Sequence, residues 1–193
     1  MLPMLCLVAL AGCATDGSQV NEYLDRDTAV TIRAVGAPYV YEHEVPEMGV
    51  NVRDYLSIGA VEVNNMGARK HYLAVVSWST VDRSWVGAPA APKPEALTLA
   101  LAGRPRELTL ATHDRRSLGI GIAPITAPIG YAGESWYRVA LGDLRAFAAT
   151  PPESIDIEVD GRRASYTLWE RGDAAFAEFL RDTPDQIESQ PRH

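Results

Sequence analysis

Polar and apolar residues alternate along most of the chain from Tyr23 onward, and this two-residue period predicts β-strands rather than helices. Residues 70–79 are apolar on both faces, which predicts a central strand covered on both sides. The apolar phase slips near Gly59 and Ala60, which predicts a β-bulge there. Strands are expected at residues 28–35, 39–45, 55–63, 70–79, 97–101, 107–110, 136–141, 155–159 and 162–169.

Turn residues between these runs predict two hairpins. Asp160 and Gly161 separate two alternating runs and are typical of a two-residue type I′ turn, in which both residues need φ > 0. In that register Ile155, Ile157 and Val159 share a face with Ala164, Tyr166 and Leu168, and Glu158 lies opposite Arg163. A second hairpin is expected around residues 102–105.

Two short helices are expected in the C-terminal half. One lies within residues 142–150, around residues 143–147, and the other begins near Asp173 with an apolar stripe of Phe176, Phe179 and Leu180. Glycine and proline in residues 119–133 indicate an irregular segment. The fold class is therefore mainly β, a single-domain β-sandwich or barrel-like sheet with two short helices in the C-terminal half.

The first residues differ from the rest, because residues 1–12 carry no charge and are too short to span a bilayer as a helix. Leu10-Ala11-Gly12-Cys13 resembles the lipobox of uncharacterised bacterial lipoproteins. The resemblance implies that residues 1–12 are a cleaved signal peptide, that Cys13 carries the lipid, and that the protein faces the periplasm. By resemblance to enterobacterial lipoproteins, Ala14 favours the outer over the inner membrane. The alternative is an ordinary signal peptide with an incidental Cys13.

Removal of the signal leaves residues 13–22 as a tether, residues 23–183 as one β-rich globular domain and residues 184–193 as a polar tail. Cys6 leaves with the signal, so the mature chain has a single cysteine and no intramolecular disulfide. The net charge of −7 argues against nucleic acid as a partner. The expected partners are the membrane, through the lipid anchor, and an envelope protein.

No metal or cofactor is expected. His43, His71 and His113 do not form a ligand motif, and Glu42-His43-Glu44 on a strand would place the imidazole on the face opposite the two carboxylates. The pairs Asp25/Asp27 and Asp156/Glu158 are assigned to a turn and to a solvated hairpin face.

The catalytic residues stay unassigned. Ser135 lies in Gly133-Glu-Ser-Trp-Tyr137, where tyrosine replaces the second glycine of a nucleophile elbow. Ser77, Ser79 and Asp82 are interpreted as the polar end of a strand. Gly119 and Gly121 are too sparse for a dinucleotide-binding loop.

A proline-rich loop supplies the candidate partner contact. Trp85, Val86, Pro89 and Pro92 combine apolar area with a restricted backbone, which reduces the entropy lost on docking. The tryptophans at 78, 85, 136 and 169 are interpreted as core anchors, with a sugar-stacking platform as the alternative and Trp85 as the one expected to be exposed.

Two functions follow. The first is a cell-envelope lipoprotein that acts as a non-enzymatic binding or scaffolding module. The second is a periplasmic hydrolase or glycan-processing enzyme whose catalytic residues are dispersed along the chain.

Overall fold

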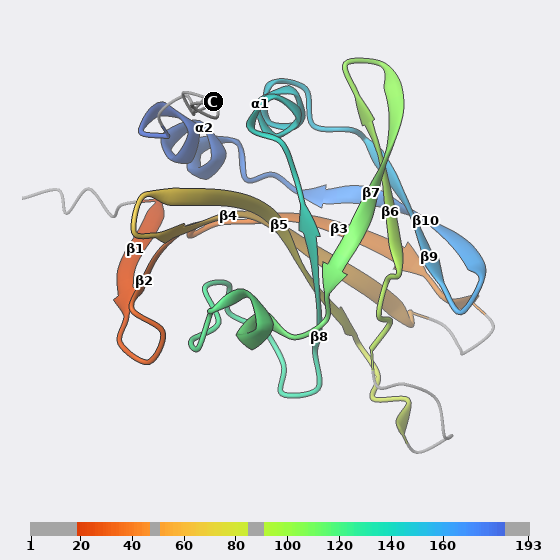
Figure 1. Ribbon diagram of the computed structural model, residues 1–193. Helices are drawn as coiled ribbons and strands as arrows, with labels where there is room; N and C mark the ends of the chain where they lie inside the picture. The colour runs from red at the N-terminus through yellow and green to blue at the C-terminus, as the bar shows by residue number, and fades with distance from the viewer. Residues whose placement is uncertain (1–18, 47–50, 85–90, 184–193) are drawn as a thin grey trace, which may run out of the picture.

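The computed structural model describes residues 19–46, 51–84 and 91–183 (Figure 1). The strands are β1 (Val20–Asp25), β2 (Val30–Val35), β3 (Tyr39–Glu44), β4 (Arg53–Asn65), β5 (Ala68–Ser79), β6 (Ala96–Leu101), β7 (Arg104–Thr112), β8 (Gly133–Arg138), β9 (Ser154–Val159) and β10 (Arg162–Glu170). The helices are α1 (Leu141–Ala149) and α2 (Asp173–Arg181), and a 3₁₀ turn covers Arg115–Leu118.

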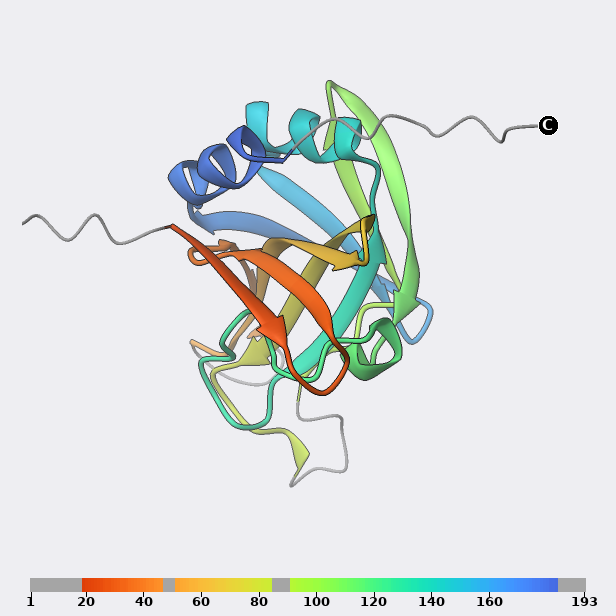
Figure 2. The same ribbon diagram turned by 60° about the vertical axis from the view of Figure 1, so that its left-hand side comes forward.

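Eight of the strands form a closed antiparallel barrel, which confirms the mainly-β, barrel-like expectation. The sheet runs β1-β2-β4-β3-β10-β9-β6-β7-β8-β5, and pairing of β5 with β4 closes it (Figure 2). β1 and β2 extend the sheet outside the barrel. Residues 71–77 of β5 are all buried, as expected for a central strand.

Helices α1 and α2 lie side by side over one end of the barrel (Figure 1). Phe147 of α1 and Phe176 of α2 pack on each other and on Tyr39, with ring centroids about 5 Å apart. Phe176 and Phe179 are fully buried, which confirms the expected apolar stripe. The helices therefore plug this end, which we call the capped end.

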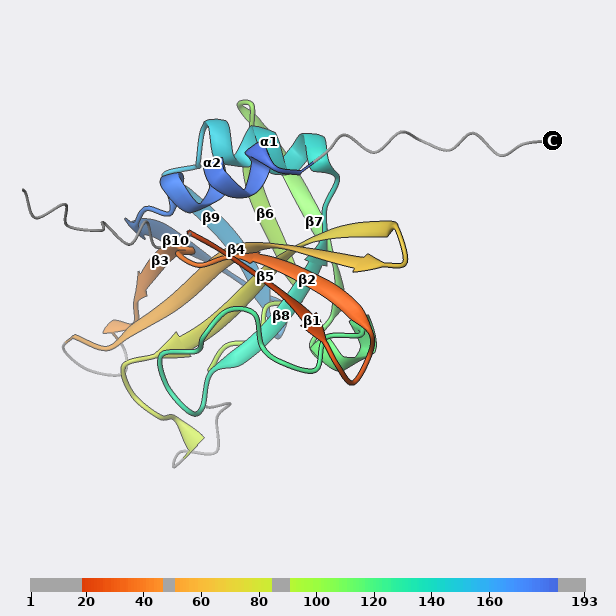
Figure 3. The same cartoon turned by 90° about the vertical axis from the view of Figure 1, so that its left-hand side faces the viewer.

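A second apolar layer lies outside the barrel. The irregular segment between β7 and β8 runs along the outside of the barrel (Figure 3). Its residues Ile120 and Ile125 pack with side chains of β2, β4, β5 and β8. The carboxylate of Asp25 accepts N–H groups of Gly121 at 2.6 Å and Ile122 at 3.3 Å, and these bonds lower the pKa of Asp25, the first most. The segment is thus tied to the end of β1.

The change of apolar phase at Gly59 and Ala60 has a different cause from the expected β-bulge. The pairing of β4 with β5 continues through both residues without a shift, so the prediction of a bulge in this ladder was wrong. On its other edge β4 pairs with β3 up to Ile58 and with β2 from Val61. The apolar phase changes because the buried side chains up to Ala60 belong to the barrel core, whereas Val61 and Val63 belong to the outer apolar layer.

The turn chemistry predicted both hairpins. Asp160 and Gly161 have φ of 50° and 70°, Arg163 pairs with Glu158, and Ala164 pairs with Ile157, which confirms the type I′ turn and its register. The other turn is tighter than expected, since Ala102 and Gly103 form it and residues 104–105 already belong to β7.

The sequence-based expectation missed one strand and misplaced another. The first expected strand was 28–35, but the sheet begins with β1 at Val20, so β1 includes part of the expected tether. As an edge strand paired only with β2, β1 has one fully buried residue and a weak apolar pattern. The strand expected at 136–141 spans Gly133–Arg138, because α1 already begins at Leu141.

Candidate functional site

No helix among the described residues covers the barrel end opposite α1 and α2, and we call this end the mouth. A cavity of about 510 Å³ lies there, between the ends of β3 and β9, the beginnings of β4 and β10, and the segments that follow β3 and β5. Apolar side chains from β9 and β10, including Ile157, Val159 and Ala164, form part of its wall. Asp160 and Arg162 lie on the rim beside the hairpin turn. The mouth therefore holds an amphipathic cavity.

Strand alternation places His43 in the mouth. Glu42 and Glu44 lie on the other face of β3, where both carboxylates pair with Arg53 at 3.0 and 3.2 Å. The Nδ1 of His43 lies 2.9 Å from the carbonyl oxygen of Ser165. A carbonyl oxygen only accepts, so Nδ1 carries the hydrogen and Nε2 is the acceptor in the neutral ring. The expected separation of the imidazole from the two carboxylates is confirmed.

An ion pair at the mouth joins Asp54 of β4 to Arg83 in the segment after the neighbouring strand β5. Asp54 is 5% exposed, so its charge depends on this partner. Tyr166 also lines the cavity, and burial raises the pKa of its hydroxyl while the nearby charge of Arg83 opposes that shift.

Residues on both sides of the undescribed part of the proline-rich loop lie at the mouth. Arg83 and Pro92 both line the cavity, and the hydroxyl of Ser77 donates a hydrogen bond to the carbonyl of Pro92. Of the candidate contact residues, Pro92 is therefore placed at the mouth. Trp85, Val86 and Pro89 lie outside the described residues, as does Cys13.

The described tryptophans have three different environments. Trp136 is a buried core anchor, as expected, and Trp78 is half-buried and stacks on Tyr55 at 4.1 Å. Trp169 is 53% exposed, so its interpretation as a core anchor was wrong. Its ring lies under the guanidinium of Arg53 at 5.7 Å, on the outer face of the sheet.

The candidate serines are held in structural hydrogen bonds. The hydroxyls of Ser77 and Ser79 donate to backbone carbonyls of Pro92 and Arg53. Ser135 lies 2.9 Å from Nδ1 of His113, but it is fully buried within strand β8 rather than at an exposed turn. A nucleophile must be reachable by its substrate, and the Ser135 hydroxyl is not.

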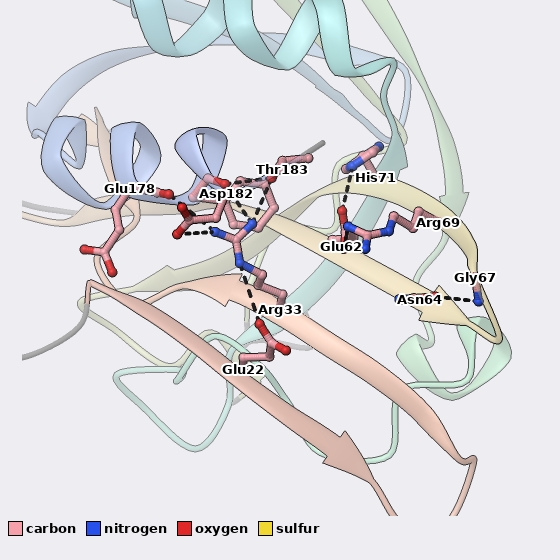
Figure 4. A network of polar contacts seen from close by, with 11 residues as sticks. Glu22, Arg33, Glu62, Asn64, Gly67, Arg69, His71, Glu178, Asp182 and Thr183 are labelled. Atoms are coloured by element: carbon pink, nitrogen blue, oxygen red, sulfur yellow. Dashed lines mark hydrogen bonds and ion pairs between the residues drawn. The ribbon is translucent and has the colours of Figure 1, made fainter. Parts of the chain in front are cut away.

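A polar network at the capped end was missed by the sequence analysis (Figure 4). The guanidinium of Arg33 in β2 donates to the carbonyl of Phe179 at 2.7 Å and to the hydroxyl of Thr183 at 2.8 Å, at the C-terminal end of α2. It also lies 3.5 Å from the carboxylate of Asp182. The signal was present in the sequence, since Arg33 interrupts an otherwise apolar strand.

Glu62 of β4 connects this network to β5. Its carboxylate lies 3.1 Å from Nε2 of His71 and 3.2 Å from the guanidinium of Arg69 (Figure 4). Burial would raise the pKa of Glu62, but the hydrogen bond from His71 and the charges of Arg69 and Arg33 outweigh it and hold the pKa below its ordinary value. Glu62 is therefore a buried carboxylate at neutral pH.

A second cavity, of about 380 Å³, lies beside Glu62 and His71. It is lined by Arg69, Lys70, His71 and Arg138 and by residues 139–141, where α1 begins. We call it the basic pocket.

The described residues contain no cluster of three or more His, Cys, Asp or Glu that could hold a metal ion. No helix among them is long and apolar enough to cross a membrane. The described residues define a closed β-barrel with helices over one end and a cavity at the other. Comparison of the chain with protein-family models, with curated proteins and with solved structures returns no match, so function has to be inferred from this geometry.

Proposed function

We propose that this protein is a non-enzymatic binding module of the bacterial cell envelope and that it receives its ligand or partner segment at the mouth of the barrel. One observation carries the proposal, which is the cavity of about 510 Å³ at the one end of the barrel that the helices leave open. The mouths of β-barrels are among the places where binding sites recur.

The chemistry of the mouth indicates the kind of partner. Val45, Ile157 and Val159 supply apolar area, while His43 and the Asp54–Arg83 pair supply polar groups that fix orientation. The chain carries a net charge of −7, which favours a neutral or basic partner. A short peptide segment of another envelope protein combines these properties.

A pair of neighbouring substitutions tests the mouth. Ala164 of β10 lines the cavity, whereas the next residue, Ser165, is exposed. Ala164→Phe fills the mouth with a side chain that displaces the partner, and Ser165→Phe adds the same ring to the other face. We expect partners captured from solubilised membranes by wild type to be lost with Ala164→Phe and retained with Ser165→Phe. Retention by both folded variants would contradict the proposal.

The location in the envelope is part of the proposal and is supported by Leu10-Ala11-Gly12-Cys13. We propose that Cys13 carries the lipid and anchors the domain in the outer membrane, facing the periplasm. Cells grown with labelled palmitate are expected to label wild type and not Cys13→Ser. Equal labelling of both proteins would contradict the anchor.

The second hypothesis, a periplasmic hydrolase or glycan-processing enzyme, makes an opposite prediction. Turnover of a glycan or ester by the purified protein, abolished by Ala164→Phe and not by Ser165→Phe, would assign catalysis to the mouth and overturn the non-enzymatic proposal.

A further inference from the structure

The basic pocket at the capped end is lined by four basic side chains from two neighbouring strands. Arg69, Lys70 and His71 belong to β5, and Arg138 ends β8, which pairs with β5. Lys70 and Arg138 are exposed, and neither forms an ion pair with another described residue. Two cations thus face solvent beside a cavity, where like charges repel unless an anion lies between them.

The N-terminus of α1, where backbone N–H groups carry partial positive charge, lies at the same cavity. Ala140 and Leu141, the N-cap and the first residue of α1, line it. Ala140 provides no side-chain cap, so the first N–H groups of the helix need another acceptor. Asp143 in the first turn pairs with Arg106 at 3.3 Å.

His71 supplies an independent observation. It is 4% exposed, and its Nε2 donates to Glu62, because an ionised carboxylate can only accept. The other ring nitrogen, Nδ1, points away from Glu62 (Figure 4) and has no hydrogen-bond partner among the described residues, while the ring lines the cavity. A nearly buried side chain thus directs an unused polar atom into the pocket.

From this arrangement we infer that the basic pocket binds a phosphate group. Phosphate oxygens accept from Lys70, Arg138 and the first N–H groups of α1. A monohydrogen phosphate also carries one O–H group, which donates to Nδ1 of neutral His71. A protonated His71 instead donates to a phosphate oxygen, so the group is complementary to both states of the ring. Sulfate lacks the O–H group and fits only the second.

Two sources can present a phosphate that carries this O–H group, a soluble phosphate and the monoester phosphate of a lipid headgroup. The chain enters the domain at the same end, since the backbone N–H of Gln19 donates to Glu178 of α2 at 3.1 Å. Residues 14–19 span at most about 20 Å when extended. If Cys13 is anchored as proposed, the capped end, which carries the basic pocket, is the end that the anchor holds near the membrane.

Calorimetric titration of the full-length, detergent-solubilised protein with inorganic phosphate, at constant ionic strength, tests the site. We expect saturable binding with a Kd on the order of 1 mM or below, and weaker binding of sulfate. Lys70→Gln combined with Arg138→Gln is expected to weaken phosphate binding at least about tenfold. Arg26→Gln, which removes an exposed arginine in the β1–β2 turn, is the matched control and should bind as wild type does.

Three results would overturn the inference: no saturable phosphate binding, equal binding by the double variant, or equal affinity for sulfate. Repeating the titration after reconstitution into vesicles identifies the source. Loss of phosphate binding in phosphatidic acid vesicles but not in phosphatidylcholine vesicles assigns the pocket to a lipid headgroup, and retention in both assigns it to a soluble phosphate. Partner capture at the mouth by the double variant should stay unchanged, so failure of one site is distinguishable from failure of the other.

Discussion

Replacement of Arg33 by methionine tests how the capped end is held. Arg33 is 7% exposed and bonds the C-terminal end of α2 through Phe179 and Thr183 at 2.7 and 2.8 Å. Its guanidinium also lies 4.7 Å from the centre of the Phe179 ring. Helix C-terminal carbonyls have no intrahelical partner and carry partial negative charge. A buried cation there supplies both the missing hydrogen-bond donors and a compensating positive charge.

The expected cost follows from these contacts. Hydrogen bonds from a charged donor contribute about 1.5–3 kcal/mol each, but desolvating the guanidinium offsets part of that gain. Thr183 still donates to the carbonyl of Phe179 at 2.6 Å after the substitution, so that oxygen keeps one partner. We therefore expect Arg33→Met to lower the free energy of unfolding by about 3 kcal/mol.

Urea unfolding measures the loss, and amide hydrogen exchange locates it. Arg163→Met is the control, because Arg163 is exposed opposite Glu158 on the hairpin and its loss should cost less than about 0.5 kcal/mol. Exchange should accelerate at the end of α2 and not in the barrel strands. The reasoning is refuted if Arg33→Met is as stable as the control or if its faster exchange spreads evenly over the sheet.

Three further substitutions test other parts of the account. Gly161→Val places a β-branched residue at φ 70° and should cost about 1–2 kcal/mol in urea unfolding; a neutral result would mean that the turn is not type I′. Gly59→Val would bring a Cβ within 2.3 Å of Ile125 Cδ1, so it should destabilise by about 1–3 kcal/mol, and Ile125→Ala should recover part of that loss if the contact is real. The pKa of Glu62 is lower in the folded state than its ordinary value of 4.5, so the ionised carboxylate stabilises the fold above that pH and this stabilisation is lost as the pH falls. Glu62→Gln should therefore be less stable than wild type at pH 7 and should lose less stability on acidification. Identical dependence of stability on pH in the two proteins would contradict the network.

The elements that local chemistry determines were predicted correctly. Asp160-Gly161 defines its turn within two residues, and the pairing of Glu158 with Arg163 follows from the turn alone. The stripe of Phe176 and Phe179 likewise needs only helical periodicity. These features involve residues close together in the sequence.

The mouth depends on contacts between distant parts of the chain. His43 and Tyr166 come together because β3 pairs with β10, and no local pattern specifies that partner. The same holds for β4. The change of apolar phase at Gly59 was visible in the sequence, but the change of neighbouring strand from β3 to β2 was not. Periodicity shows which face of a strand is buried but not what covers it.

The buried charges were the overlooked signal. Arg33 and Glu62 occupy positions in apolar strands, where an unpaired charge would be costly. Two such residues of opposite sign could have been read as partners, and they do face each other across β2 and β4. The helix end and His71, which complete the network, could not be foreseen without the closed barrel.

The most direct test of the proposed function is site-specific photo-crosslinking in growing cells. A photo-reactive amino acid at Ala164 reports on the mouth, and the same residue at exposed Ser165, one position along β10, reports on the other face. The account predicts a discrete crosslinked partner from position 164 that is absent from position 165. Equal crosslinking from both positions, or a partner from position 165 alone, would contradict binding at the mouth.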